Sequence, residues 1–317
     1  MKLVLGIDTS NYTTSICLVG EDGKVVADQR KILNVASGAR GLRQSEALFQ
    51  HVKNLPELTA NIQNHFNTNT LTAIGVSAKP RPRDDSYMPV FIPGTSFASS
   101  LGHILGIPVY ETTHQETHIW SGVASSGGLK ESRFLALHLS GGTTELTEVK
   151  RYSNDFRLAV ESLGCTLDLH AGQLVDRLGV KLGLPFPAGP LLENLANKTL
   201  ETVPISTFHR NGKISFSGPL TALERIVGQV EPEILARTCL DVIARTLIKW
   251  IRFTESKTDC REILVIGGVA ANLLIREQLE KSLPDWKLFF ASPKYSVDNA
   301  YGAAYYGALR AGIITIS

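Results

Sequence analysis

Two histidines four positions apart give the sequence its sharpest chemical signal. His114 and His118 enclose the segment H-Q-E-T-H. On a helix, residues at i and i+4 share a face and lie about 5–6 Å apart at the base of their side chains, so both imidazoles could bind one cation. The alternative is a pair of surface histidines on a polar helix, because no third ligand is near them in the sequence.

The glutamate between the histidines separates this segment from the HExxH motif of zinc metalloproteases. Glu116 is the third residue of the segment and not the second. At about 100° per residue, it lies about 200° around a helix from His114, on the opposite face. The sequence therefore disfavours a conventional metalloprotease, because no general base is expected beside the cation.

Two turns of small residues follow apolar segments and could contact phosphate. Residues 3–7 run into Asp8, Thr9 and Ser10, and residues 133–139 run into S-G-G-T at 140–143. Backbone N–H groups and hydroxyls in such turns suit phosphate oxygens, and an aspartate at a strand end can hold a metal-bound phosphate. The alternative is that both are ordinary hairpin turns.

Two later positions have the same ambiguity between binding and local structure. Residues 267–272, G-G-V-A-A-N, open a predicted helix after the apolar segment 262–266, where an anion or nucleotide could bind. They are not a G-x-G-x-x-G motif, which disfavours a Rossmann dinucleotide site. Asp298 stands where the N-cap of the last helix belongs, and capping alone could explain it.

The elements that must position these residues follow a repeated pattern. Strands are predicted at 3–7 and 15–20 with a hairpin turn at 21–24, then a helix from about Ser45 that breaks near Pro56. A strand, a glycine turn and a returning strand occur again from residue 133. This repetition predicts a duplicated α/β domain, with two unrelated hairpins as the alternative.

Composition sets wider bounds. The chain has 317 residues, which suggests about two domains, and its net charge of +2 gives no global attraction to nucleic acid or to anionic membranes. The four scattered cysteines indicate neither a disulfide framework nor a zinc knuckle. An early acid at Asp8 and the lack of a run of about 18 apolar residues predict no signal peptide, no membrane span and a cytoplasmic location.

Taken together, these motifs resemble the tRNA threonylcarbamoyladenosine transferase family (TsaD), long labelled O-sialoglycoprotein endopeptidase. The resemblance covers nearly the whole chain and keeps the order of the family's motifs. The matching segments are 6–10 (G-I-D-T-S for G-I-E-T-S), 114–118 (H-x-E-x-H), 139–143 (L-S-G-G-T for V-S-G-G-H), 163–190, 214–218 (I-S-F-S-G for F-S-F-S-G), 267–272 (G-G-V-A-A-N for G-G-V-S-A-N) and 297–300 (V-D-N-A for T-D-N-A).

The resemblance implies a fold and an activity. The fold would be the duplicated RNase H-like α/β domains of the actin/sugar-kinase/Hsp70 ATPase superfold, with subdomains at 1–130 and 131–317 and the C-terminal helix packed back on the N-terminal half. The reaction would pass a threonylcarbamoyl group from its AMP anhydride to N6 of an adenosine beside the tRNA anticodon. The implied partners are an adenine nucleotide (ATP or an acyl-AMP), tRNA and a paralogous protein subunit, with no membrane.

The resemblance also assigns site residues. Asp298 would join His114 and His118 on one divalent metal, iron or zinc. Asp8 and Ser10, in the first turn, are the expected catalytic residues. The expected nucleotide or substrate contacts are Leu139, Ser140, Gly141, Gly142, Thr143, Asp176, Gly189 and Asn272.

Several acidic positions and one histidine of the family's motifs are replaced, which predicts a divergent paralogue with slow standard chemistry. The alternatives are a non-catalytic or regulatory nucleotide-binding protein and an ATP-dependent kinase-like enzyme. The replacements are N-Y-T-T at 11–14 for C-D-E-T, Leu169 for the second aspartate of D-D, Gln173 for the glutamate of A-G-E and Thr143 for the histidine of V-S-G-G-H.

Overall fold

The computed structural model describes residues 1–10, 12–35 and 42–316, and these form two compact units. The first unit comprises residues 1–132, 151–159 and 294–317, and the second comprises residues 133–150 and 160–293. The chain thus leaves the first unit and returns to it twice. Asn11, one of the positions that depart from the family's opening motif, lies outside the described residues.

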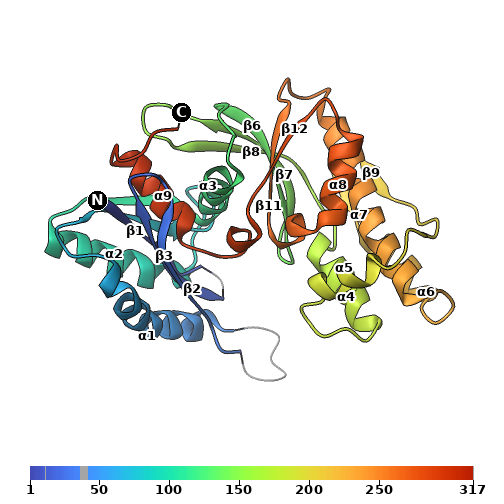
Figure 1. The fold of residues 1–317 in the computed structure, drawn as a ribbon, viewed down its shortest axis with the longest axis horizontal. Helices are drawn as coiled ribbons and strands as arrows, with labels where there is room; N and C mark the ends of the chain where they lie inside the picture. The colour runs from blue at the N-terminus through green and yellow to red at the C-terminus, as the bar shows by residue number, and fades with distance from the viewer. Residues whose placement is uncertain (11, 36–41, 317) are drawn as a thin grey trace. The chain divides into compact units, whose positions relative to one another are not determined.

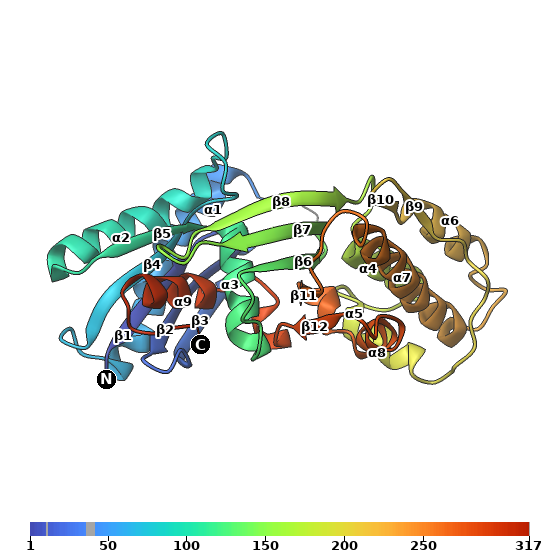
Figure 2. The same cartoon turned by 90° about the horizontal axis from the view of Figure 1, so that it is seen from above.

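The first unit is built on a five-stranded sheet in the order β3-β2-β1-β4-β5; Figure 1 labels β1, β2 and β3, and Figure 2 labels all five strands. The central strand β1 pairs antiparallel with β2 and parallel with β4, and β4 pairs parallel with β5. The strands are β1 (Leu3–Asp8), β2 (Thr13–Gly20), β3 (Val25–Ile32), β4 (Leu71–Lys79) and β5 (Val109–Thr113). The helices are α1 (Gln44–Ile62), α2 (Ile92–Leu105), α3 (His114–Ser126) and α9 (Tyr301–Arg310), with single 3-10 turns at Gln63–His65, Pro89–Phe91 and Pro293–Tyr295.

The side chains of β1 alternate between the two faces of the sheet, and this decides which helix each of them contacts. Successive residues of a strand point to opposite faces, so Leu3, Leu5 and Ile7 share one face and pack with apolar side chains of α1 and α2. Gly6 lies on the other face, where α9 approaches so closely that a Cβ would be 2.2 Å from the Ala300 carbonyl oxygen. Asp8 follows on this same face.

The second unit repeats the strand plan of the first. Its sheet has the order β12-β11-β6-β7-β8, in which β6 pairs antiparallel with β7 and parallel with β11, and β11 pairs parallel with β12 (Figure 2). The predicted duplication is therefore confirmed. The strands are β6 (Arg133–Leu139), β7 (Thr144–Arg151), β8 (Leu158–Cys165), β11 (Glu262–Ile266) and β12 (Lys287–Phe290), with a small hairpin of β9 (Phe208–Arg210) and β10 (Lys213–Ser215).

Five helices complete the second unit around one large apolar cluster, in which the long helix α7 supplies Trp250 and many aliphatic side chains. They are α4 (Ala171–Lys181), α5 (Gly189–Ala196), α6 (Ser217–Arg225), α7 (Pro232–Thr254) and α8 (Leu273–Ser282), and Gly268–Ala271 forms a 3-10 turn before α8. None of the helices in the described residues is long and apolar enough to cross a membrane.

One sequence prediction about these elements is wrong. The first helix does not break at Pro56, because α1 continues to Ile62 with this proline inside it. Proline removes the hydrogen bond to the carbonyl of residue i−4. That residue is Val52, which is 51% exposed, so the lost hydrogen bond lies on the solvent-facing side of the helix.

Candidate metal centre and nucleotide-binding residues

The two histidines stand at the start of α3 because the helix begins directly at the end of β5. Thr113 is the N-cap: its Oγ1 accepts a hydrogen bond from the Glu116 N–H at 3.2 Å, and Glu116 Oε2 accepts one from the Thr113 N–H at 3.0 Å. This reciprocal capping box fixes the first turn of the helix. His114 and His118 then lie one turn apart on one face, as their spacing predicts.

The Glu116 carboxylate makes hydrogen bonds that stabilise the fold, and it does not contact the two histidines. Besides the Thr113 N–H, its carboxylate accepts hydrogen bonds from Thr112 Oγ1 at 3.2 Å and from the Leu158 N–H at 3.3 Å. Its side chain is buried, and these donors occupy both of its oxygens. The carboxylate thus holds α3 to β5 and to Leu158, a residue of the first unit, and cannot act as a general base between the imidazoles.

Asp298 comes from the loop before α9, and the interpretation that it only caps this helix is wrong. The side chain that accepts a hydrogen bond from the Tyr301 N–H is Asn299, at 2.9 Å. Asn299 Oδ1 also accepts from Ser121 Oγ, while Nδ2 donates to the carbonyls of Tyr295 and Val297. Sequence reasoning missed Asn299, although it adjoins Asp298 in the V-D-N-A motif. Asn299 therefore provides the hydrogen bond that the capping interpretation assigned to Asp298.

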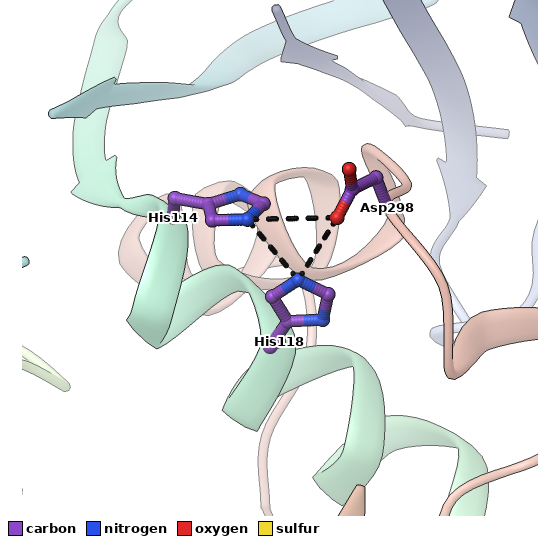
Figure 3. Close-up of side chains that lie close together, drawn as sticks. All are labelled: His114, His118 and Asp298. Atoms are coloured by element: carbon purple, nitrogen blue, oxygen red, sulfur yellow. Dashed lines mark hydrogen bonds and ion pairs between the residues drawn. The ribbon is translucent and has the colours of Figure 1, made fainter. Parts of the chain in front are cut away.

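The three expected ligands converge within the first unit, as Figure 3 shows. His118 Nε2 lies 3.2 Å from His114 Nε2 and 3.3 Å from Asp298 Oδ1, and His114 Nε2 lies 3.6 Å from the same oxygen. Four ligands at about 2.0–2.1 Å around a tetrahedral Zn²⁺ are about 3.3 Å apart. The residues present therefore fit one divalent cation, with its remaining coordination positions left to water or substrate.

Asp8 adds a second carboxylate behind His114. Its Oδ2 lies 3.2 Å from His114 Nδ1, and its Oδ1 accepts a hydrogen bond of 2.8 Å from the Ser10 N–H. Burial lowers the pKa of the His114 imidazole, but Asp8 and then Asp298 outweigh that effect and raise the pKa above its ordinary value. Ser10 contributes this backbone contact, and its side chain is fully buried.

The expected phosphate-binding turn lies in the second unit between β6 and β7. Ser140 Oγ accepts hydrogen bonds from the Gly142 and Thr143 N–H groups, at 3.2 and 2.9 Å. The turn thus provides a hydrogen-bond acceptor for two of its own backbone N–H groups. Gly141 and Gly142 are open, since a Cβ built on either would meet nothing within 4 Å. A ligand could therefore approach this backbone closely.

The other expected nucleotide contacts lie in the same unit, and each also has a local structural role. Asp176, on α4, accepts a hydrogen bond of 2.8 Å from the Ala188 N–H, just before Gly189 begins α5. Asn272 is the N-cap of α8 and accepts from the Ile275 N–H at 3.0 Å. Glu193, which sequence reasoning missed, accepts from the Leu273 N–H at 2.6 Å, so a carboxylate of the protein already occupies this helix terminus.

The matched segment 163–190 also contains Asp168, a carboxylate of the second unit to which the resemblance assigns no role. Asp168 accepts hydrogen bonds from the hydroxyls of Ser215 and Ser217 and from the Phe216 N–H. Partial burial raises its pKa, but these donors stabilise the ionised form and bring the pKa down to about 2. The cluster ties the β8–α4 connection to the start of α6.

Solved structures identify the fold. The T. kodakarensis HypF superposes with a TM-score of 0.61 at 13% identity, covering 99% of this chain and 48% of that chain. A ROK family glucokinase from Streptomyces griseus, solved with glucose and AMPPNP, gives a TM-score of 0.57 at 14% identity and covers 97% of this chain and 99% of that chain. The actin/sugar-kinase architecture expected from the resemblance is confirmed.

Proteins related in sequence identify the family, whereas the solved structures identify only the fold. A tRNA N6-adenosine threonylcarbamoyltransferase of Chlorobium phaeobacteroides (strain BS1) is 28% identical over 97% of this chain and 93% of its own length. One from Legionella pneumophila (strain Lens) is 30% identical over the same shares. The family model named TsaD, tRNA N6-adenosine threonylcarbamoyltransferase, matches residues 26–305. Since that match spans most of both units, the chain belongs to the TsaD family.

Proposed function

We propose that this chain transfers a threonylcarbamoyl group to N6 of a tRNA adenosine, using one divalent metal and an adenine nucleotide or acyl-AMP. The observation that carries the proposal is the convergence of His114, His118 and Asp298, from segments far apart in the sequence, in a member of the TsaD family. A tRNA substrate implies action in the cytoplasm, and a paralogous protein subunit remains an expected partner.

The residues divide the chemical work between them. A cation held by the three ligands would polarise a phosphate or carbamate oxygen as a Lewis acid. The Asp298 side chain is 26% exposed, against 15% for His114 and 7% for His118, so substrate would approach from the carboxylate side. In the second unit, the open backbone at Gly141 and Gly142 would contact the nucleotide. Iron and zinc both suit this mixed nitrogen and oxygen ligand set.

The test supplies purified protein with threonylcarbamoyl-AMP, unmodified tRNA and the partner subunits, and measures modified adenosine and bound metal. His118→Ala and Asp298→Ala should lose the metal and slow turnover by about 10²-fold or more, since Lewis-acid stabilisation is worth several kcal/mol. His103→Ala is the matched control, because this histidine is exposed on α2. Full metal content in both ligand variants would show that the proposed site is wrong.

A second candidate is a nucleotide-binding protein that does not turn over. Two positions where the family motif carries an acid serve structure here: Leu169 packs against the core of the second unit, and Gln173 Oε1 accepts a hydrogen bond from the His170 N–H at 3.1 Å. Losing a positioned acid or base costs about 10²–10⁴-fold in rate. Nucleotide binding without any modified tRNA in the same assay would favour this candidate, and phosphorylated product would favour a kinase-like enzyme.

A further inference from the structure

Asp8 is a buried carboxylate whose two oxygens face different donors. Its side chain is only 1% exposed at the end of β1. Oδ1 accepts the Ser10 N–H at 2.8 Å, which fixes the rotation of the carboxylate. Oδ2 is thereby directed at His114 Nδ1, 3.2 Å away. An ionised carboxylate can only accept hydrogen bonds, so the ring nitrogen that faces it must carry the proton.

The position of that proton decides what His114 can bind. In a neutral imidazole one nitrogen donates and the other accepts, so a proton on Nδ1 leaves the lone pair on Nε2. Nε2 is the atom that faces His118 Nε2 and Asp298 Oδ1. We propose that Asp8 is a positioning residue that holds the proton of His114 on Nδ1 and so presents Nε2 to the cation. This inference rests on the metal site of the proposed function.

The Ser10 contact makes the substitution Asp8→Asn unusually informative. The Ser10 N–H needs an acceptor, so the amide oxygen of the asparagine would take the place of Oδ1. The amide nitrogen would then replace Oδ2 and donate toward His114 Nδ1. The proton of the imidazole would have to move to Nε2, which could no longer bind a metal. Asparagine is nearly isosteric with aspartate, so the side-chain packing is preserved.

The experiment measures Zn²⁺ affinity by competition with a chromophoric chelator, and the tautomer of His114 by ¹⁵N NMR of the metal-free protein. The wild type should show a protonated Nδ1. Asp8→Asn should show a protonated Nε2 and bind Zn²⁺ about 10–100-fold more weakly, the usual cost of losing such an outer partner. Asp8→Glu, which keeps the carboxylate, should keep Nδ1 protonated and lose less affinity than Asp8→Asn.

Ser77→Ala is the matched control. Ser77 is buried on β4 next to Val76, which pairs with Ile7, so the substitution perturbs the same part of the sheet without touching the His114 hydrogen bond. Its Zn²⁺ affinity should equal that of the wild type. The NMR readout separates positioning from the loss of a nearby negative charge, since charge loss alone would weaken Zn²⁺ binding and leave the proton on Nδ1.

The outcomes are decisive even if a variant folds poorly. A neutral His114 that carries its proton on Nε2 in the metal-free wild type, recorded at a pH above the raised pKa of the imidazole, overturns the proposal without any variant. Unchanged Zn²⁺ affinity in folded Asp8→Asn also overturns it. If His118→Ala binds Zn²⁺ as tightly as the wild type, the metal site of the proposed function fails as well. Loss of Zn²⁺ in His118→Ala together with full binding in Asp8→Asn would reject the positioning role of Asp8 but leave the proposed metal site in place.

Discussion

Asp298 and Asn299 are neighbours in the chain but serve different purposes. The Asn299 side chain is 1% exposed and makes four hydrogen bonds that shape the loop before α9. The Asp298 side chain is partly exposed and faces two histidines. One residue therefore builds the loop that presents the other as a ligand.

This division predicts opposite effects of alanine at the two positions. Asn299→Ala leaves several buried polar groups without partners at about 1–3 kcal/mol each, so we expect a large loss of unfolding free energy. Asp298→Ala should change the metal-free protein by about 0.5 kcal/mol or less, yet abolish tight metal binding. Urea unfolding in the presence of a chelator, followed by Zn²⁺ titration, measures both. Equal stability losses in the two variants would contradict the assignment.

Asp168 predicts a pH dependence in the second unit. Its pKa of about 2 lies below the ordinary value of 3.8, so its ionised form stabilises the folded state above about pH 4. That contribution is lost as the pH falls from about 4 toward about 2. Asp168→Asn should therefore be less stable than the wild type at pH 6, by about 1 kcal/mol after allowance for solvent exposure, and the difference should shrink at pH 3.

Urea unfolding at the two pH values is the measurement. Asp285→Asn is the control, because it makes the same substitution at an exposed aspartate of the same unit. A stability difference between Asp168→Asn and the wild type that grows on acidification would contradict the prediction.

At the scale of elements, the junction between β5 and α3 positions the metal ligands. Glu116→Gln would replace one carboxylate oxygen by an amide group facing an N–H donor, either that of Thr113 or that of Leu158. We expect a loss of about 1–3 kcal/mol in unfolding free energy and unchanged metal stoichiometry, since Glu116 faces away from the ligands. Thermal unfolding and elemental analysis check this. Metal loss without destabilisation would place Glu116 at the metal.

Some of these elements could be predicted from local pattern and others could not. The spacing of His114 and His118 fixes a shared face because helical geometry is local. The same geometry excludes Glu116 as a general base beside the cation, because it places this residue on the opposite face of the helix. Asp298 is separated from both by most of the chain, so only the family resemblance could propose it as a ligand. The predicted break at Pro56 failed because its cost depends on whether the lost hydrogen bond faces solvent, which no local pattern records.

At the scale of the whole molecule, the first unit depends on a helix from the end of the sequence. α9 packs against β1 and β4 through glycines: a Cβ on Gly75 would lie 1.9 Å from the Ala303 carbonyl oxygen. On its other side, a Cβ on Gly302 would lie 1.9 Å from the carbonyl oxygen of Thr117, the residue before His118. Close packing of α9 thus fixes α3 and the Asp298 loop together.

Gly75→Ala should consequently damage both stability and metal binding. The new methyl group must displace α9, which we expect to cost about 3 kcal/mol or more of unfolding free energy and to weaken Zn²⁺ binding. Gly218→Ala is the control, because a Cβ at this position would meet nothing within 4 Å. Gly218 lies in α6, where alanine is a better helix former than glycine. Wild-type stability in Gly75→Ala would show that α9 can shift freely.

The discontinuity of the first unit has a consequence for biosynthesis. Domains usually fold in the order in which the ribosome makes them, N-terminal first. Here residues 133–293 complete the second unit before residues 294–317 supply α9 and Asp298. Until then, the glycine-lined face of the first sheet lacks α9, and the two histidines lack the Asp298 carboxylate. The nascent chain should therefore bind its metal only after residues 294–317 have been made, so that a bound ion marks a polypeptide in which both units are assembled.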